Sequence, residues 1–500
     1  MKIQSLLEHH GIRTNPFVDE DAQTDLVFKE FCISGTFHPA WDKVFGDPTE
    51  PATAIVFGEK GAGKTALRLQ IVQHVKRFND THPDRKLHVI QYDDFNPFLD
   101  RFRDKLPVRQ RRPDRMLAQW KLWDHMDAIL TLGTTQLVDA VLSDADPAPG
   151  ALDATRLRAK RLDRLQARDA LLLAACYDQS LAEPFTTRWH RLRRRLHYHT
   201  WRSHWAQALG LLITLAVAGV LISQYVSQRT WEWLSSPWPY VFVAAGWIPW
   251  LWRAANRYFR ALAITRQLRV VAHDANSLRR VLARFTNEEL SGQPLPTRER
   301  SDDRYEMLNK YLALLKALGY SGTFVLVDRV DEPTLVNGQA EPMRALIWPL
   351  LDNKLLKHPG MGFKLLLPIE LAHHIDREDR EFYQRARLDK QNLVRSLHWS
   401  GEALYDIANA RLQACAADGR QPKLCDLFDD QVGERRLIEV LRSLRVPRHL
   451  FKFMYQVLTA HCNAHTDDQP VWTISSATFE AALALYHREQ DAFDRGLGAG

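Results

Sequence analysis

Residues 52–75 read ATAIVFGEKGAGKTALRLQIVQHV, and this stretch decides the fold. The apolar run at 55–57 is β-branched or aromatic and lies between turn-forming residues, which predicts a buried parallel strand. A glycine-rich turn follows, and after it apolar residues recur at helical spacing. A strand, a glycine turn and a helix in this order predict an α/β fold with a parallel sheet.

The glycine turn fits the pattern G-x(4)-G-K-[ST]. Its glycines let backbone N–H groups point at phosphate oxygens without Cβ clashes. Lys64 adds a positive charge, the Thr65 hydroxyl can ligate Mg²⁺, and the helix that begins there directs its positive dipole end at the same phosphates. We predict an ATP-binding loop with Lys64 as a catalytic group; a chance glycine turn is the alternative. The loop residues are Gly58, Glu59, Lys60, Gly61, Ala62, Gly63, Lys64, Thr65 and Ala66.

Residues 322–333, GTFVLVDRVDEP, predict a second strand that ends in carboxylates. A Mg²⁺ ion that bridges phosphates needs an acidic partner at the tip of the neighbouring strand, and we expect Asp328 there. Thr65 and Asp328 are therefore the predicted metal ligands. ATP hydrolysis also needs a base, for which Glu332 is the first candidate and Asp331 the second. A plain acidic loop is the alternative.

Two further apolar runs predict strands of the same sheet. The run at 87–92 is followed by Asp93 and Asp94, which either face the nucleotide crevice or form a turn. The run at 362–370 ends with Glu370 and offers no Asn or Thr that could sense the nucleotide.

The helical segments near the C-terminus contain arginines that can reach a γ-phosphate, in the same chain or across a subunit contact. Among them we favour Arg448 over Arg387 as a nucleotide-binding group. An ordinary solvated arginine is the alternative for both.

Two stretches without charged residues lie between the two motifs. The first, at 205–228, contains GLLITLAVAGVLI and is apolar enough for a spanning helix, with a buried core helix as the alternative. The second, at 233–252, is weaker because prolines and serines shorten its regular part, although its tryptophans suit the headgroup region. We predict a membrane hairpin, with a re-entrant or interfacial segment as the alternative for the second stretch.

Arginines flank this hairpin on both sides, whereas the loop at 229–232 has only Arg229 against Glu232. Under the positive-inside rule both flanks are cytoplasmic, which predicts an inner-membrane protein with two spanning helices and both termini in the cytoplasm. The arginines then face anionic lipid; solvated helix faces are the alternative. The flanking residues are Arg188, Arg191, Arg193, Arg194, Arg195 and Arg202 before the hairpin, and Arg253, Arg257, Arg260, Arg266 and Arg269 after it.

A chain of 500 residues exceeds what one hydrophobic core usually organises. We predict that a helical arm and the hairpin split one P-loop NTPase domain, which a C-terminal helical subdomain follows. The predicted segments are 1–110 (first part, with the phosphate loop), 111–204 (helical arm), 205–253 (hairpin), 254–300 (returning helix and linker), 301–400 (second part, with the acidic strand) and 401–500 (helical lid).

The composition of the chain bears on its partners, its cysteine chemistry and its compartment. The net charge of +7 is modest and concentrated near the apolar stretches, so we do not expect direct contact with nucleic acid. The five cysteines form no C-x-x-C pair and have no zinc-site spacing, which favours reduced thiols. The N-terminal sequence has no apolar core of signal-peptide length, so the first segment is expected in the cytoplasm.

The phosphate loop, the DRVDE strand end and a hairpin between them together resemble the KAP-type P-loop NTPases, within the broader STAND and AAA+ assemblage. The resemblance covers 50–100 and 305–460 and the placement of the hairpin. Family members commonly carry DDLDR-like strands, from which DRVDE at 328–332 departs. The resemblance implies a membrane-associated ATPase switch or assembly platform, with several such proteins in bacterial conflict systems. It also implies a homo-oligomer and a protein partner.

The leading hypothesis is therefore a membrane-anchored ATPase that hydrolyses Mg-ATP slowly to switch its assembly state. The alternative is a nonenzymatic, nucleotide-bound membrane scaffold or membrane-disrupting effector. A transporter is disfavoured because the two apolar stretches carry no charged residue for coupling.

Overall fold

The structure is a computed structural model that describes residues 1–143, 152–154, 162–180, 183–200, 205–228, 232–417 and 419–494. The chain divides into two compact units. Unit 1 comprises Met1–Pro83, Thr323–Arg344 and Leu351–Gly500, and unit 2 comprises Asp84–Gly322 and Ala345–Leu350. Both sequence motifs belong to unit 1 and the hairpin to unit 2, whereas residues 84–110, expected with the phosphate loop, group with unit 2.

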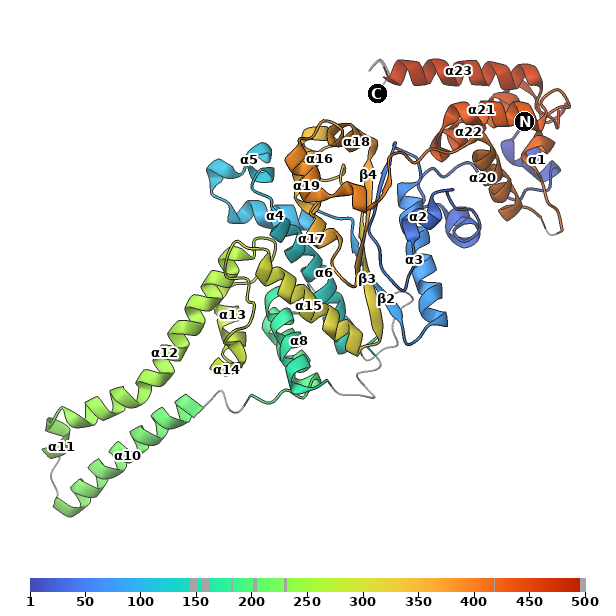
Figure 1. Ribbon diagram of the computed structural model, residues 1–500. Helices are drawn as coiled ribbons and strands as arrows, with labels where there is room; N and C mark the ends of the chain where they lie inside the picture. The colour runs from blue at the N-terminus through green and yellow to red at the C-terminus, as the bar shows by residue number, and fades with distance from the viewer. Residues whose placement is uncertain are drawn as a thin grey trace. The chain divides into compact units, whose positions relative to one another are not determined.

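A five-stranded sheet of order β2-β3-β4-β1-β5 forms the α/β part of the chain (Figure 1). Strand β1 pairs in parallel with both β4 and β5, and β3 pairs in parallel with β4. The predicted α/β class with a parallel sheet is confirmed, and the expected strands are present. The strands are β1 (Ala54–Gly58), β2 (Lys86–Tyr92), β3 (Tyr320–Val327), β4 (Met361–Pro368) and β5 (Asn392–Val394).

The strand order corrects one prediction. Strand β3 is not the neighbour of β1, because β4 lies between them and pairs with both. Residues of β1, β3 and β4 are buried almost throughout, as expected for central strands with both faces covered. Because these strands are parallel, the loops that follow β1 and β3 leave from the same edge of the sheet. Asp328 therefore still ends near the phosphate loop.

The helices of unit 1 include α3, which follows the phosphate loop, and a C-terminal group that packs with the N-terminal helix. Leu6 and Leu7 share one apolar core with Leu404, Phe453 and Phe479, and Figure 1 shows α1 beside the C-terminal helices. The C-terminal segment is thus a helical subdomain completed by the start of the chain. The helices are α1 (Ile3–His9), α2 (Trp41–Phe45), α3 (Lys64–Thr81), α17 (Asn353–Leu356), α18 (Ile369–Ile375), α19 (Arg380–Ala386), α20 (Gly401–Ala414), α21 (Glu434–Leu444), α22 (Pro447–Ala464) and α23 (Ser476–Asp494).

Unit 2 is helical, and buried ion pairs join its core helices. Arg304 on α15 pairs with Asp127 on α6 at 3.1 Å, with both side chains fully buried. Arg269 pairs with Asp124 at 2.8 Å. The helices are α4 (Asn96–Lys105), α5 (Pro113–Leu117), α6 (Leu122–Leu142), α8 (Arg164–Tyr177), α9 (Phe185–Arg195), α13 (Ala275–Leu282), α14 (Asn287–Leu290) and α15 (Asp302–Ala317); α16 (Ala340–Ile347) runs from unit 1 into unit 2.

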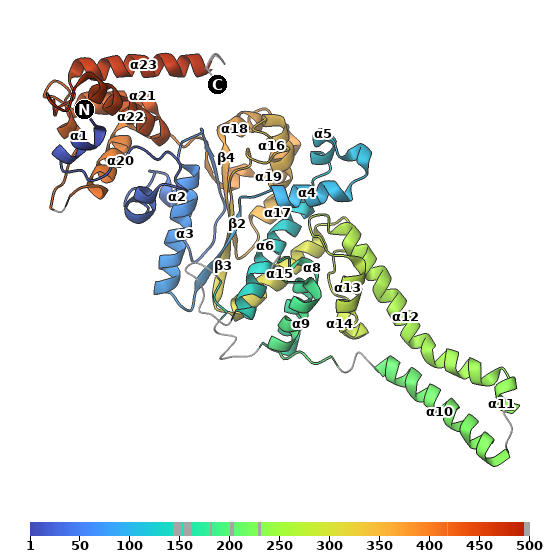
Figure 2. The ribbon, with the colours of Figure 1, turned by 180° about the vertical axis from the view of Figure 1, so that it is seen from behind.

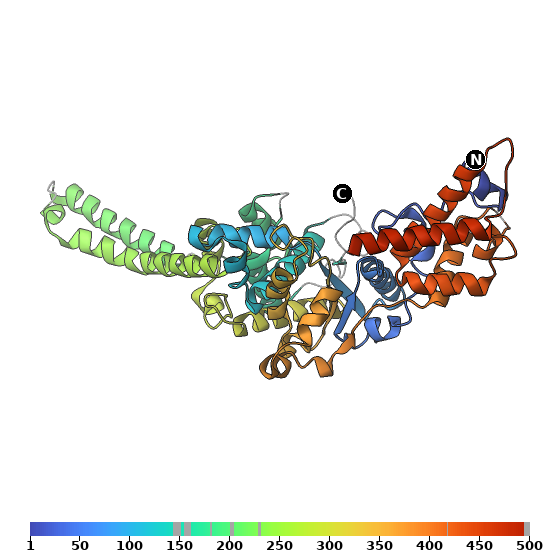
Figure 3. The same ribbon diagram turned by 90° about the horizontal axis from the view of Figure 1, so that it is seen from above.

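The predicted hairpin consists of α10 (Trp205–Gln228) and α12 (Trp238–Gln267), which lie side by side in Figures 2 and 3, with the short α11 (Glu232–Ser235) before α12. Among the described residues, Trp205–Ser227 is the one helix long and apolar enough to cross a membrane. The second span is not supported by this measure. Helix α12 is continuous through Pro249, but its apolar part is rich in Trp, Tyr and Pro and gives way to arginines. Arg202 and Arg229 lie outside the described residues.

Candidate functional site

The loop between β1 and α3 has the backbone conformation that its glycines permit. Gly61 and Gly63 have φ angles of +84° and +92°, a left-handed region that residues with a Cβ rarely adopt. Helix α3 begins at Lys64, directly after this turn. The free N–H groups of its first turn and its dipole therefore lie at the loop, an arrangement that favours an anion.

Lys64 folds back over the loop that precedes it. Its ammonium donates hydrogen bonds to the carbonyls of Gly58 at 2.7 Å and Glu59 at 3.0 Å. Burial lowers the pKa of Lys64, and the nearby carboxylates of Asp328, Asp331 and Glu370 act in the opposite direction. The loop thus holds the half-buried Lys64 ammonium in the field of three acidic groups.

Thr65 and Asp328, the two predicted metal ligands, are in contact although 263 residues separate them. The Thr65 hydroxyl donates to the Asp328 carboxylate over 3.2 Å. Asp328 is only 2% exposed, and burial raises its pKa, opposed first by Arg68 and then by Lys64. The Nε of Arg68 lies 3.5 Å from the same carboxylate oxygen. Sequence reasoning missed Arg68; its position one helical turn after Lys64 was the available signal.

The donor set at Thr65 and Asp328 fits Mg²⁺ only in part. A hydroxyl and a carboxylate are oxygen ligands of the kind that Mg²⁺ prefers, and this ion usually completes its shell with water and substrate phosphates. Within the described residues, no group of three or more His, Cys, Asp or Glu is placed to hold a metal ion. A magnesium ion here would therefore depend on nucleotide phosphates, which agrees with its place beside the loop.

The two candidate bases lie differently. The charge of Asp331 is one of the main influences that raise the pKa of Lys64, and Glu332 is not among those main influences. The Glu332 side chain is 56% exposed and lies 3.4 Å from the Nη1 of Arg329. Burial raises the pKa of Glu332 and Arg329 opposes the change. The structure therefore brings Asp331 toward the loop, while the role of Glu332 as base stays a prediction.

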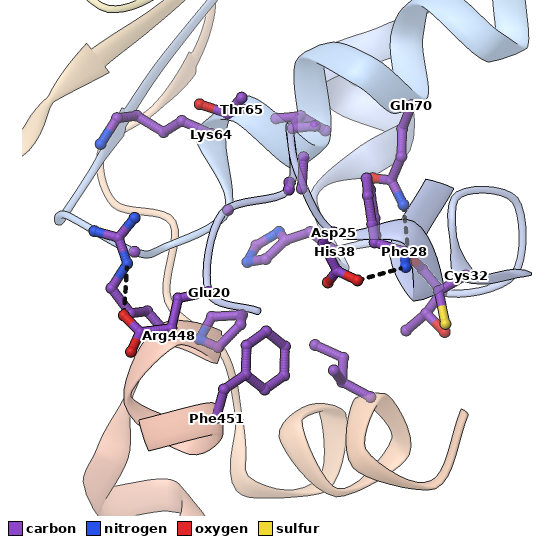
Figure 4. Close-up of a pocket in the computed structure, with 18 of the residues that line it drawn as sticks. Glu20, Asp25, Phe28, Cys32, His38, Lys64, Thr65, Gln70, Arg448 and Phe451 are labelled. Carbon is purple, nitrogen blue, oxygen red and sulfur yellow. Dashed lines mark hydrogen bonds and ion pairs between the residues drawn. The ribbon is translucent and has the colours of Figure 1, made fainter. Parts of the chain in front are cut away.

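Arg448 lies at the start of α22, against the loop. Its backbone N–H donates to the Gly61 carbonyl over 3.4 Å, and a Cβ on Gly61 would meet the Arg448 side chain at 2.5 Å. The Nε of Arg448 is 3.8 Å from a carboxylate oxygen of Glu20. Figure 4 shows its guanidinium and the Lys64 amine at the same end of the cavity. Arg387, by contrast, pairs with the exposed Asp389 and does not line this cavity.

A cavity of about 160 Å³ adjoins the loop, within unit 1 (Figure 4). The loop, the N-terminal segment at 20–38 and the C-terminal helices supply its walls, and Phe28, His38 and Phe451 give it an aromatic part. Sequence reasoning did not find these walls, because the residues come from both ends of the chain and share no local pattern.

Trp399 joins the C-terminal helices to the loop. Its Nε1 donates to the carbonyl of Ala62 over 2.9 Å, and its ring lies 4.7 Å, edge-on, from that of His38. A tryptophan that holds a loop carbonyl fixes the loop's conformation from outside. Its role was not visible in the sequence, where Trp399 precedes the helical subdomain without a motif.

The sequence left open whether Asp94 faces the nucleotide crevice or forms a turn, and in the structure it stabilises a turn. Its carboxylate accepts a hydrogen bond from the backbone N–H of Asn96 over 3.1 Å, at the start of α4, as a turn-forming aspartate does. The site thus draws its acidic groups from the ends of β3 and β4, with the cations of α3 and α22 opposite them. Searches of family models, of curated proteins and of solved structures find no match to this chain.

Proposed function

We propose that the protein is a membrane-anchored P-loop ATPase of the KAP type, which binds Mg-ATP and hydrolyses it slowly to switch its assembly state. The contact between Thr65 and Asp328 carries the proposal. The Thr65 hydroxyl and the Asp328 carboxylate come from motifs far apart in the chain and lie 3.2 Å apart, next to the start of α3 and the half-buried Lys64. Phosphoryl transfer on such sites is catalysed by positioning and by neutralising the developing charge.

Each residue has a distinct task in this proposal. The N–H groups of the loop, residues 58–66, and the ammonium of Lys64 hold the phosphates. Thr65 and Asp328 hold Mg²⁺, which neutralises phosphate charge when it is bound. Glu332 or Asp331 accepts the proton of the attacking water. Arg448 stabilises charge at the γ-phosphate, and the aromatic part of the cavity takes the base.

The packing of α10 and α12 supports a membrane anchor that includes both helices. Gly210 lies against the ring of Trp247 and Gly246 against Ile213, so close that an added Cβ would meet them at 2.9 and 3.0 Å. The Trp247 Nε1 also donates to the Thr214 hydroxyl over 3.1 Å. Small residues and polar cross-links between helices are the usual means of association in a bilayer, where apolar side chains gain nothing from burial.

The outer surface of the hairpin agrees with this environment. Large apolar side chains on both helices face outward, and a continuous apolar surface of this kind would be unfavourable in water. With the arginine-rich flanks inside, the protein is a two-pass inner-membrane protein with both termini in the cytoplasm. The exposed residues include Leu211, Leu212, Leu215, Ile222, Val226, Val241, Phe242, Ile248, Leu251 and Trp252.

A nonenzymatic role is the second candidate, and the position of Glu332 favours it. The Glu332 carboxylate is exposed and lies beside Arg329, and a site without a base at the γ-phosphate would bind ATP without hydrolysing it. In that case ATP is a ligand that holds an assembly together, and the hairpin is the scaffold or the membrane-disrupting effector. Both candidates include a homo-oligomer and a protein partner, in keeping with a role in bacterial defence; neither needs nucleic acid.

Binding of Mg-ATP to the detergent-purified full chain tests the proposal. Lys64→Ala removes the lysine charge at the loop and should abolish binding in a calorimetric titration, a loss of at least about a hundredfold in affinity for a charge-assisted phosphate contact. Lys76→Ala, farther along α3, is the matched control and should bind as the parent does. Equal affinity of Lys64→Ala and the parent would overturn the phosphate-loop assignment.

A further inference from the structure

Arginines gather where the hairpin joins the rest of unit 2. Helix α12 packs against α13, and α13 packs against α9, as Figure 2 shows. The Nη2 of Arg257 on α12 donates to the carbonyl of Phe285, which follows α13, over 2.9 Å. This ties the hairpin to the surface from which the other arginines extend. The arginine cluster consists of Arg193 and Arg194 before α10, Arg253, Arg257 and Arg260 on α12, and Arg284 after α13.

These guanidinium groups are close enough to act on one another. The charges of Arg253 and Arg260 oppose that of Arg257. On α9, burial lowers the pKa of His190, and the charges of Arg284, Arg193 and Arg194 lower it further. Since Arg284 precedes Phe285 directly, the hydrogen bond from Arg257 to the Phe285 carbonyl brings the two groups of arginines next to each other.

Among the residues that the structure describes, three members of the cluster have buried N–H groups without hydrogen-bond partners. Arg257 is only 8% exposed, yet its Nε finds no such partner there. Arg193 donates from Nη1 to the Thr200 hydroxyl over 2.7 Å, but its Nε is unsatisfied. The guanidinium of Arg253 lies 4.3 Å from the ring centre of Trp205, and its Nη1 is buried without a partner. Such groups are costly unless a hydrogen-bond acceptor completes them, and an anion is the strongest acceptor for a guanidinium.

Unit 2 provides carboxylates for other arginines that are buried or partly buried. Arg304, Arg269 and Arg188 each pair with an aspartate, at 3.1, 2.8 and 2.7 Å. Arg193, Arg253 and Arg257 form no ion pair with any carboxylate among the described residues. The same fold thus neutralises arginines in its interior and leaves those at the hairpin base to neutral partners.

We propose that the arginine cluster binds the phosphate of an anionic phospholipid at the cytoplasmic membrane surface. The planar guanidinium matches phosphate oxygens with paired N–H donors. Trp205, on which Arg253 stacks, begins the apolar α10, and tryptophan at such a position suits the headgroup region. A nucleic acid carries the same phosphates, but it would leave the adjoining apolar side chains of α10 and α12 in water. The inference rests on the proposed membrane position of the hairpin.

Lipid nanodiscs test the two ideas separately. The full chain is reconstituted in phosphatidylcholine alone or with phosphatidylglycerol added, and the lipids that stay bound after transfer to detergent are identified by native mass spectrometry. Stable reconstitution in phosphatidylcholine tests the hairpin; enrichment of phosphatidylglycerol among the retained lipids tests the arginine cluster. The test variant is Arg193→Gln with Arg253→Gln, which spares the buried Arg257. The control, Arg435→Gln with Arg442→Gln on α21, removes the same charge elsewhere.

The parent and the control should retain phosphatidylglycerol in preference to phosphatidylcholine, and the test variant should lose about thirtyfold of this preference, since each basic group near an anionic surface contributes about fivefold. Equal preference in the test variant and the control would overturn the proposal. So would a parent without lipid preference whose binding of a labelled RNA oligonucleotide is weakened by the same substitutions. Failure to reconstitute in phosphatidylcholine would refute the membrane position itself.

Discussion

We propose that the phosphate loop of unit 1 and the arginine cluster of unit 2 each bind a phosphate through positively charged side chains, and the two sites differ in what surrounds those side chains. Around Lys64 lie the carboxylates of Asp328, Asp331 and Glu370. Around Arg257 lie other arginines and a backbone carbonyl. A lysine surrounded by carboxylates suits a nucleotide that binds together with Mg²⁺, because the carboxylates can hold the metal ion and accept a proton during hydrolysis. A cation among cations suits an anion that only binds. The predictions below test this difference, beginning with the largest expected effect.

Substitution of a candidate base should have the largest effect, because the carboxylates at the phosphate loop can accept the proton of an attacking water. Glu332→Gln keeps size and hydrogen bonding but removes the base, so it should bind Mg-ATP as well as the parent while hydrolysis falls by roughly a hundredfold. Phosphate release by the purified chain measures it. Asp331→Asn is the matched variant, and the structure, which brings Asp331 nearer to Lys64, makes it the stronger rival.

The hydrolysis rates of the parent, Glu332→Gln and Asp331→Asn decide between the ATPase and the nonenzymatic scaffold. If only Asp331→Asn loses hydrolysis, the base is reassigned and the enzyme remains. A parent without measurable hydrolysis would instead favour the nonenzymatic scaffold. Accumulation of the slow variant in its ATP-bound assembly, seen by size-exclusion chromatography, would link hydrolysis to the switch.

Removal of Mg²⁺ should weaken ATP binding at the phosphate loop and leave lipid binding at the arginine cluster unchanged. Asp328→Ala removes the proposed metal ligand, so affinity for ATP with Mg²⁺ should fall by about thirtyfold, as for a lost hydrogen bond to a charged group, and affinity without Mg²⁺ should fall much less. Paired calorimetric titrations with Mg²⁺ and with a chelator measure both. Equal losses would mean that Asp328 serves packing with Arg68. The lipid preference of the arginine cluster should not respond to the chelator.

The sequence predicted which motif residues meet at the loop better than it predicted the residues that surround them. Thr65 and Asp328 were found because each lies at the end of a strand or the start of a helix with a recognisable local pattern. Arg68 and Trp399 were missed, since their roles depend on contacts across the fold, and Trp399 meets Ala62 across 337 residues. The position of β4 between β1 and β3 depends on crossovers that no local pattern records.

The hairpin shows the same limit. Sequence alone placed both apolar stretches correctly on helices, because the absence of charge is a local property. It did not find the glycine contacts between α10 and α12, which depend on the register of two helices. It also found the flanking arginines without showing which have aspartates as partners: Arg188 and Arg269 are paired, whereas Arg253 and Arg257 are not.

The glycine contacts between α10 and α12 predict a smaller effect, on stability, and it tests the packing of the proposed membrane hairpin. In Gly210→Leu the new side chain would meet the Trp247 ring, and overpacking of this kind costs about 2 kcal/mol. Thermal unfolding in detergent should show it. Gly219→Leu is the control, because no atom lies within 4 Å of a Cβ built there. Equal stability of the two variants would mean that α10 and α12 do not pack at Gly210.

The smallest expected effect is a change with pH in the free energy of unfolding, caused by Lys364. It tests whether a buried amine in unit 1 keeps its charge when its hydrogen-bond partners are carbonyls. The Lys364 ammonium on β4 donates to the carbonyls of Val44, Phe45 and Ala52 at 2.7, 2.9 and 2.8 Å. Burial lowers the pKa of Lys364 to about 7 from the ordinary value of 10.5. Between these two pH values the unfolded chain binds a proton that the folded chain has released, so the free energy of unfolding should rise with pH.

The slope is at most about 1.4 kcal/mol per pH unit for one group, and less near the folded pKa, so we expect about 1 kcal/mol between pH 7 and 8. Urea unfolding across this window measures it. Lys364→Met removes the titrating group and should flatten the rise, whereas Lys357→Met, at an exposed position, should keep it. Identical slopes in the parent and Lys364→Met would show that the three carbonyls hold the ammonium charged. A buried cation would then need no carboxylate to keep its charge, and the arginine cluster would need no lipid phosphate for that purpose.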